Sequence, residues 1–455
     1  MNVVLISTYE LGHQPFGVAS AAAWLKAEGA RITCIDLAVE SLPGSAVERA
    51  ELIVFYLPMH TATRIASETI RQVRKINPAG HLCCFGLYAP VNEGFLRRLG
   101  VDTVLGGEFE EGLAALCRRL SAGGPHAAEG DQYEPRISLA KQQFRVPDRS
   151  GLPDLSRYAF VQMGDGERRV AGYTEASRGC KHTCRHCPIV PVYGGRFRIV
   201  QREVVLEDIR RQVAAGARHI TFGDPDFFNG PGHAIPLVEA LHKEFPDLTY
   251  DVTIKIEHLL KYARYLPVLR DTGCLFVTSA VEAVDDTILT IFDKRHTRTD
   301  FIRVVALFRE VGLTLSPTFV AFTPWTTCQG YLDLLQVILD LDLVEHVAPI
   351  QYAIRLLIPA GSKLLDLPEV QALVGPFDDM ALSYPWQHSD PRMDRLQAAV
   401  LQTVQRGLAR HEPRQTIFQR VWQLAHQAAG SEHAPSLPYG VPRAPIPYLS
   451  EPWYC

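Results

Sequence analysis

Residues 177–196, SRGCKHTCRHCPIVPVYGGR, decide the fold because they place Cys180, Cys184 and Cys187 at spacings of four and three residues. The apolar run before them, residues 170–177, predicts a strand, and the surrounding glycines and prolines favour a loop. Three thiolates can hold three irons of a [4Fe–4S] cluster and leave the fourth iron open to a small bidentate ligand. The sequence therefore predicts that these three cysteines are metal ligands in a loop after a strand.

A structural zinc site is the alternative, because zinc takes four closed ligands and His182 or His186 could supply the fourth. Zinc sites usually pair cysteines from two separated knuckles, and no second C-x-x-C follows downstream. Six of the ten cysteines are scattered, mostly in apolar runs, and are expected to be buried hydrophobic residues. The iron–sulfur interpretation is favoured.

Strand and helix patterns alternate on both sides of the cysteine loop. Six strand–helix steps predict a partial (β/α)6 barrel of the TIM type, with its chemistry at the carboxyl ends of the strands. Its strands are expected at residues 170–177, 219–224, 248–256, 274–283, 313–322 and 348–359.

Residues 1–120 form a separate run of βα units, which predicts a doubly wound, Rossmann-like α/β domain. Its first turn lacks G-x-G-x-x-G, which weakens a dinucleotide interpretation. In such sheets a ligand binds outside the carboxyl ends of the strands. The residues expected there are Ser7, Thr8, Pro58, Met59, Thr61, Gly86, Leu87, Gly107 and Glu108.

Four segments are therefore expected along the chain. Residues 1–120 are the Rossmann-like domain, 121–170 a linker, 171–365 the barrel, and 366–455 a helical cap with a proline-rich tail. The cap helices are expected at residues 391–412 and 416–429.

Composition excludes several classes of protein. Of the 455 residues, 47% are hydrophobic and 21% are charged, as in soluble globular proteins. The formal net charge is −4 and there is no block of basic residues, so the sequence has no obvious positively charged surface for nucleic acid or an anionic membrane. No signal peptide or membrane-spanning run is apparent, so a cytoplasmic protein is expected.

Residues 171–365 strongly resemble the radical SAM superfamily, through the cysteine motif and through FGDPDFFN, SAVEAVDDTIL, IFDKRHT and LLIPAGSKL. The resemblance implies that Cys180, Cys184 and Cys187 hold the cluster. It also implies contacts to S-adenosylmethionine (SAM) from Gly223 and Asp224, from Ser279 and Glu282, and from the strand that contains Thr318. One departure is His186, where the family usually has an aromatic residue.

Residues 1–120 resemble the cobalamin-binding domain that precedes many radical SAM enzymes. The resemblance rests on QPFGVASAAAWLKAEG with IDL, FGLYAP and VDTVLGGEFEEGL, and it implies that the strand-end residues above hold cobalamin. The motif D-x-H-x-x-G is absent, and the nearest match, Glu10, His13 and Gly17, has the wrong spacing. His13 is therefore a weak candidate for a lower cobalt ligand.

Together the two resemblances imply a cobalamin-dependent radical SAM enzyme that cleaves SAM reductively and methylates an unactivated carbon. The cofactors carry the chemistry on this interpretation, so no side chain is assigned as a nucleophile. The implied partners are a small-molecule or peptide substrate and a low-potential electron donor of the flavodoxin or ferredoxin type. Two alternatives stay open: radical cyclisation or rearrangement without methyl transfer, and an iron–sulfur electron-transfer or sensor protein.

The last residues, SEPWYC, end on Cys455. They resemble a subgroup of cobalamin-domain radical SAM proteins whose tails finish in Cys-Cys or Cys-selenocysteine followed by Ala-Glu-Pro (the CCAEP and CUAEP tails). This resemblance implies that the natural chain continues past Cys455 and that the tail thiol is functional.

Overall fold

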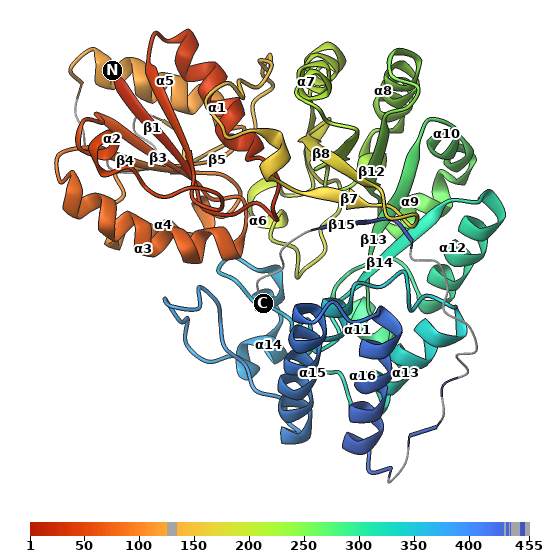
Figure 1. Ribbon diagram of the computed structural model, residues 1–455. Helices are drawn as coiled ribbons and strands as arrows, with labels where there is room; N and C mark the ends of the chain where they lie inside the picture. Colours follow the sequence, from red (N-terminus) through yellow and green to blue (C-terminus); the bar gives the residue numbers. More distant parts are fainter. Residues whose placement is uncertain (125–133, 432–433, 436, 438–445, 451–455) are drawn as a thin grey trace.

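Two largely parallel sheets, joined by an extended connector, organise the chain (Figure 1). The computed structural model describes residues 1–124, 134–431, 434–435, 437 and 446–450. The expectation for the tail at Cys455 therefore lies outside the described residues. Within the described residues, no helix combines the length and the apolar character needed to cross a membrane.

The first sheet is the predicted doubly wound one, with strand order β2-β1-β3-β4-β5-β6 and every pairing parallel. Its strands are β1 (Asn2–Ser7), β2 (Arg31–Asp36), β3 (Leu52–Tyr56), β4 (His81–Phe85), β5 (Thr103–Gly107) and β6 (Ile137–Ser138). Its helices are α1 (Phe16–Ala27), α2 (Gly44–Glu48), α3 (His60–Ile76), α4 (Glu93–Arg98) and α5 (Glu110–Ser121).

Apolar side chains on both faces fix this sheet between two helical layers. Strands β3, β4 and β5 are buried along their whole length, as continuous apolar strands of parallel sheets are. Helices α1 and α5 pack on one face, and α2, α3 and α4 pack on the other. The carboxyl ends of the strands are therefore the accessible edge, and they face the second sheet.

The second sheet has the order β14-β13-β12-β11-β8-β7-β15, and its five strands from β8 to β14 are parallel. Its strands are β7 (Phe160–Gln162), β8 (Arg168–Thr174), β11 (His219–Phe222), β12 (Thr249–Thr253), β13 (Cys274–Glu282), β14 (Thr314–Phe319) and β15 (Tyr448–Leu449). The helices between them are α7 (Arg202–Ala214), α8 (Pro231–Glu244), α9 (Ile256–Lys261), α10 (Leu266–Asp271), α11 (Asp286–Ile291), α12 (Arg298–Val311) and α13 (Cys328–Asp340).

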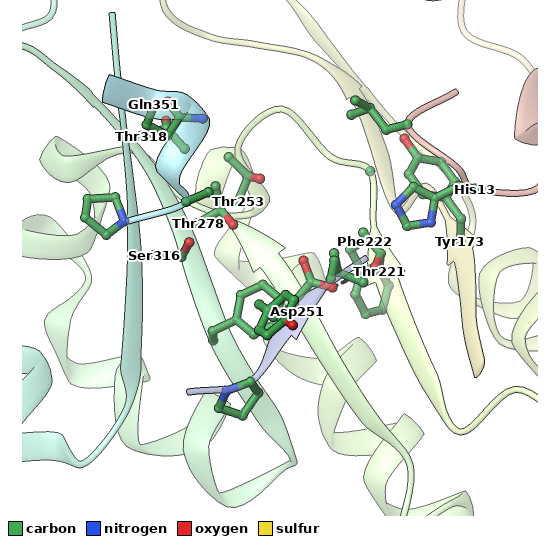
Figure 2. A pocket seen from close by; sticks show the side chains of 18 of the residues that line it. His13, Tyr173, Thr221, Phe222, Asp251, Thr253, Thr278, Ser316, Thr318 and Gln351 are labelled. Atoms are coloured by element: carbon green, nitrogen blue, oxygen red, sulfur yellow. Dashed lines mark hydrogen bonds between the residues drawn. The ribbon is translucent and has the colours of Figure 1, made fainter. Parts of the chain in front are cut away.

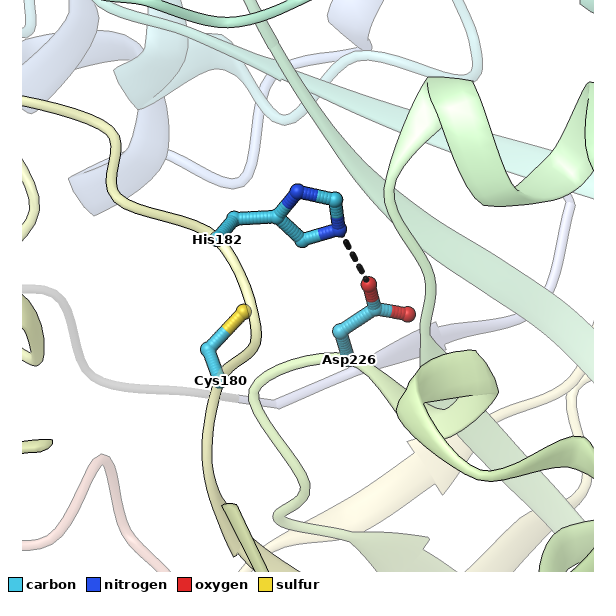
Figure 3. A group of neighbouring side chains, drawn as sticks. All are labelled: Cys180, His182 and Asp226. Atoms are coloured by element: carbon cyan, nitrogen blue, oxygen red, sulfur yellow. Dashed lines mark ion pairs between the residues drawn. The ribbon is translucent and has the colours of Figure 1, made fainter. Parts of the chain in front are cut away.

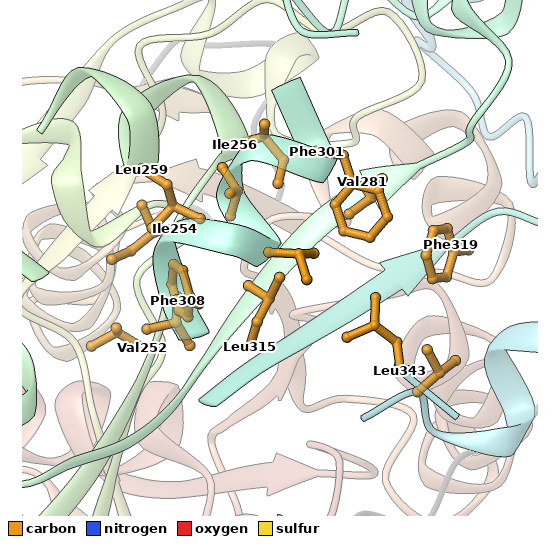
Figure 4. Packing of buried hydrophobic residues seen from close by; sticks show 14 of the residues in the cluster. Val252, Ile254, Ile256, Leu259, Val281, Phe301, Phe308, Leu315, Phe319 and Leu343 are labelled. Atoms are coloured by element: carbon orange, nitrogen blue, oxygen red, sulfur yellow. The ribbon is translucent and has the colours of Figure 1, made fainter. Parts of the chain in front are cut away.

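The main hydrophobic core lies between these strands and their outer helices (Figure 4). Local signals set the helix boundaries. Helix α12, for example, begins with a capping box in which Thr297 and Asp300 bond each other's backbone, and it ends at Gly312 in the left-handed conformation. The partial barrel is thus confirmed as a curled sheet covered by helices on its outer side.

The sixth strand of the barrel differs from the sequence expectation. Residues 348–359 form a short 3-10 helix, Pro349–Tyr352, and then an extended segment with one isolated parallel bridge between Phe322 and Arg355. Their apolar side chains pack against the cap helices α15 (Pro391–Ala409) and α16 (Arg414–Ala428), with the ring of Tyr352 5.4 Å from that of Phe418. Packing against helices, rather than strand pairing, holds this segment.

The connector and the tail contribute strands that the sequence did not predict. β6 extends the first sheet, and β7 pairs antiparallel with β8 at the edge of the second. β15 pairs antiparallel with β7, and the Phe160 N–H donates to Ser450 Oγ at 3.0 Å. The remaining short strands and α-helices of the described residues are β9 (Ser177–Gly179), β10 (Phe197–Ile199), α6 (Val190–Tyr193) and α14 (Pro368–Leu373).

Candidate functional site

The three cysteines of the motif lie in the loop between β9 and α6, at the carboxyl end of β8. Cys184 is buried, and Cys180 and Cys187 are half-buried. Burial raises the pKa of Cys187 to about 12 and also raises the pKa of Cys180, so both thiols keep their protons until a metal displaces them. The donor set fits a cation that binds thiolates.

Gly179 shapes the entry to this loop. Its φ of +74° is left-handed, and a Cβ there would lie 2.4 Å from the ring of Tyr193. Only glycine meets both conditions, and it lets the chain turn directly into Cys180.

Asp224, just after β11, accepts hydrogen bonds from residues 176 and 177, which lead to the cysteine loop. Asp224 Oδ2 accepts from the Ala176 N–H at 2.8 Å, and Oδ1 accepts from Ser177 Oγ at 2.5 Å. Burial, which outweighs these bonds, raises the pKa of Asp224 to about 7. Nearby, Asn229 Oδ1 accepts from the Lys181 N–H at 3.1 Å. Asp224 and Asn229 thus hold the chain on either side of Cys180.

Glu282 links the end of β13 to the cysteine loop. Its Oε1 lies 3.1 Å from both Lys294 Nζ and His186 Nε2. Burial alone would raise the pKa of Glu282, but the charges of Lys294 and His186 outweigh burial and hold that pKa well below its usual range. The ring of His186 packs 4.4 Å from that of Phe292, so His186 fills an aromatic position in this loop.

A second buried network stands beside Cys180. Ligand atoms of Cys180, His182 and Asp226 all lie within 4.8 Å of one another (Figure 3). Asp226 Oδ2 is 2.6 Å from His258 Nδ1 and 3.6 Å from His182 Nε2, while Oδ1 accepts from the Phe228 N–H at 3.1 Å. His182 is thus the histidine near enough to a motif cysteine to serve the zinc alternative.

A cavity of about 340 Å³ occupies the interior of the barrel (Figure 2). Of the residues predicted to contact SAM, Gly223, Asp224 and Thr318 line it. Ser279 and Glu282 are not among its lining residues: Ser279 is fully buried beside Thr278, which does line it, and successive side chains along a strand face opposite ways. The roles of all five toward SAM stay predictions.

A second cavity, of about 290 Å³, lies between the strand ends of the first sheet and the start of the second. Five of the residues predicted to hold cobalamin line it: Pro58, Met59, Gly86, Leu87 and Gly107. The other four, Ser7, Thr8, Thr61 and Glu108, are not lining residues. Thr8 Oγ1 instead donates to the Ala62 carbonyl at 2.9 Å, and Glu108 Oε1 accepts from the Tyr193 hydroxyl at 3.2 Å.

A buried arginine joins the two sheets at this second cavity. Arg178, in β9, lies 2.7 Å from Glu110, 2.6 Å from Glu175 and 3.6 Å from Glu108. Burial raises the pKa of Glu108 to about 7, although Arg178 acts in the opposite direction. The sequence singled out Glu108 but gave no indication of its pairing with Arg178, because the two residues come from different domains and share no local pattern.

The family model of the radical SAM superfamily matches residues 174–326. That segment begins at the end of β8 and contains all three motif cysteines together with β11, β12, β13 and β14. Residues 174–326 thus form a radical SAM domain. The matched segment contains the cysteine loop together with Gly223, Asp224 and Thr318 of the barrel cavity.

Curated relatives of this chain include methyl- and methylthio-transfer enzymes. Hopanoid C-3 methylase of Methylococcus capsulatus is 24% identical over 334 residues, which are 69% of this chain and 62% of the relative. A tRNA-2-methylthio-N(6)-dimethylallyladenosine synthase of Desulfosudis oleivorans is 26% identical over 224 residues, 46% of this chain and 45% of the relative. The chain therefore spans less than two thirds of either relative.

Solved structures share the radical SAM fold and its preceding domain. The cobalamin-dependent SAM radical enzyme OxsB, with aqua-cobalamin bound, has a TM-score of 0.71 at 14% identity, covering 93% of this chain and 73% of that one. The radical SAM methyltransferase TsrM from Kitasatospora setae, with cobalamin and a [4Fe–4S] cluster bound, has a TM-score of 0.60 at 18% identity, covering 75% and 73%. At these identities the likeness shows the fold.

Proposed function

We propose that this radical SAM enzyme depends on cobalamin and transfers a methyl group from SAM to an unactivated carbon of a small molecule or peptide. The observation that carries the proposal is the position of the two cavities. The cavity between the sheets and the cavity in the barrel share five lining residues: Leu11, His13, Tyr173, Gly223 and Pro225. The two cavities are therefore adjacent, as cofactors that react with each other require.

The cysteine loop fits an iron–sulfur cluster. It offers three thiols at spacings that would leave one iron of a bound cluster open to SAM. When bound, the cluster supplies the electron that cleaves SAM, and it draws that electron from a low-potential donor of the flavodoxin or ferredoxin type. The chain's own residues position the loop through Asp224, Asn229 and Glu282.

The cavity between the sheets fits a flat macrocycle such as cobalamin. Five glycines line it, so backbone rather than side chains forms much of its wall: Gly17, Gly86, Gly107, Gly179 and Gly223. Five Phe and Tyr rings supply apolar faces against which a ring system can pack: Phe16, Tyr56, Phe109, Tyr173 and Tyr193. Cobalamin would supply a methyl carrier here. The side chains of the cavity would hold it and exclude water.

The proposal is tested by anaerobic reconstitution with iron, sulfide and hydroxocobalamin, followed by a visible spectrum and product analysis with SAM and a chemical reductant. We expect bound cobalamin, about four irons per chain as a [4Fe–4S] cluster, and S-adenosylhomocysteine among the products. The triple variant Cys180→Ala, Cys184→Ala, Cys187→Ala should lose the cluster. The matched variant Cys328→Ala, outside the loop, should keep it.

Two outcomes would count against the proposal. A full cluster in the triple variant would contradict the ligand assignment. The product 5′-deoxyadenosine without bound cobalamin would instead favour cyclisation or rearrangement.

A further inference from the structure

The barrel cavity contains a buried carboxylate for which the proposed function gives no role. We propose that Asp251 is the substrate-binding residue of this cavity and that it accepts a protonated amino group of a small polar substrate. This inference rests on the proposed function, because it places the substrate in the barrel beside SAM.

Asp251 is held rigidly in the wall of the cavity (Figure 2). It lies in β12 with 4% of its surface exposed. Its Oδ1 is 2.9 Å from His219 Nε2 and accepts from Thr221 Oγ1 at 2.7 Å. His219 is fully buried, and its Nδ1 is 2.9 Å from Thr249 Oγ1. Both bonds to Asp251 end on Oδ1, so Oδ2 is available to a ligand in the cavity that Asp251 lines.

No lysine or arginine pairs with this carboxylate in the described part of the chain, where its ion-pair partner is His219. Arg414 lines the same cavity, but its guanidinium stacks over the Tyr448 ring and donates to the Glu345 carbonyl. A buried carboxylate is costly unless charge and hydrogen bonds compensate it. A cationic donor on the ligand would compensate Asp251 through Oδ2.

The strand register places Asp251 at a depth suited to a substrate. Thr221, Asp251 and Phe276 form one row across the sheet, and Thr253, Thr278 and Ser316 belong to the next row toward the carboxyl ends. Thr318 lies one row farther, opposite Ala280. Rows on one face are two residues apart, about 7 Å. Asp251 is thus about two rows below Thr318, which is predicted to contact SAM.

The row between them is rich in hydroxyl groups. Thr253, Thr278 and Ser316 line the cavity there. A purely hydrocarbon substrate would offer no hydrogen-bond partner to these hydroxyls or to Asp251 Oδ2, at a cost of about 1–3 kcal/mol for each polar group left unsatisfied. The cavity therefore favours a polar amine over a hydrocarbon.

The test uses reconstituted full-length protein saturated with S-adenosylhomocysteine, so that the probes cannot occupy the SAM position. Calorimetry compares matched pairs of probes that differ in one amino group: L-tryptophan with indole-3-propionate, tyramine with 4-ethylphenol, and D-glucosamine with D-glucose. We expect the amine of at least one pair to bind at least tenfold more tightly than its partner. Asp251→Asn should reduce that preference to less than threefold.

Matched variants separate charge from folding. Asp333→Asn neutralises a partly exposed carboxylate of α13 outside the barrel cavity and should leave the amine preference unchanged. Asp251→Glu keeps the charge and should keep the preference with altered affinity. This second variant keeps the test decisive if Asp251→Asn does not fold.

Three results would overturn the proposal: no pair prefers the amine, folded Asp251→Asn keeps the preference, or folded Asp251→Glu loses it. A tenfold loss of S-adenosylhomocysteine affinity in Asp251→Asn would also overturn it, because Asp251 would then belong to the SAM site. The cluster and cobalamin spectra of the same samples test the proposed function separately. Amine preference without bound cobalamin would contradict only the proposed function.

Discussion

Replacing Lys294 by methionine should destabilise the cysteine loop by removing the main partner of a buried charge. Lys294 is 3% exposed, and its Nζ lies 3.1 Å from Glu282 Oε1. At that separation the attraction is about 5 kcal/mol for an effective dielectric constant of about 20. Removing one member of a buried pair costs about 3–5 kcal/mol. We expect about 3 kcal/mol, since His186 remains beside Glu282.

The double variant Lys294→Met, Glu282→Gln isolates the interaction between the two residues. It removes both charges, so we expect it to cost less than the sum of the single variants by at least about 2 kcal/mol. The assay is urea unfolding followed by tryptophan fluorescence. Trp325 is a local reporter, because its ring lies 6.2 Å from that of Phe292, which also packs on His186.

Two results would refute this reasoning. One is a cost below about 1 kcal/mol for Lys294→Met, which would mean that solvent screens the pair as it does at a surface. The other is additivity of the two single substitutions within about 0.5 kcal/mol, which would mean that the residues do not interact.

Two further predictions concern a strand-end carboxyl and a strand-end glycine. The pKa of Asp224 is raised to about 7, so its protonated form favours the folded state. The free energy of unfolding of the wild-type protein should therefore decrease as the pH rises from about 4 to about 7. In urea titrations across this range, we expect the decrease to be smaller by roughly 4 kcal/mol in Asp224→Asn. An equal pH slope in both proteins would contradict this. Gly86→Ala should lower the free energy of unfolding by at least about 1–3 kcal/mol in the same assay, because φ is +114° and the new Cβ would lie 2.7 Å from the Leu57 carbonyl oxygen. The control is Gly44→Ala. It should be neutral or slightly stabilising, because the space around Gly44 is open. Equal effects at the two glycines would show that backbone strain is not the cause.

The sequence predicted the parts of the fold that depend on local patterns. The alternation of strands and helices, the cysteine spacing and the helices α15 and α16 all have short-range signals. It misjudged residues 348–359, because an apolar run fits a buried strand and a helix-packed segment equally well. Tertiary packing against Phe418 decided between the two.

The candidate site was predicted less completely. Arg178 and its glutamates meet only when the two sheets are in contact, so no spacing along the chain indicates them. Asp251 did have a signal. In residues 248–256, LTYDVTIKI, polar residues recur at Thr249, Asp251 and Thr253, which places one polar face inside the barrel. That alternation could have pointed to Asp251.

Strand β15 is made last during translation, although it pairs with β7, which is made much earlier. Ser450 bonds Phe160, a residue 290 positions earlier in the chain. At about 5–20 residues per second, a ribosome needs about 15–60 s to make the intervening segment. During that time the residues of β7, β8 and the cysteine loop have emerged, but the strand that lines this side of the cavity does not yet exist. Once β14 has been made, translation thus leaves an interval in which the barrel still lacks its β15 edge.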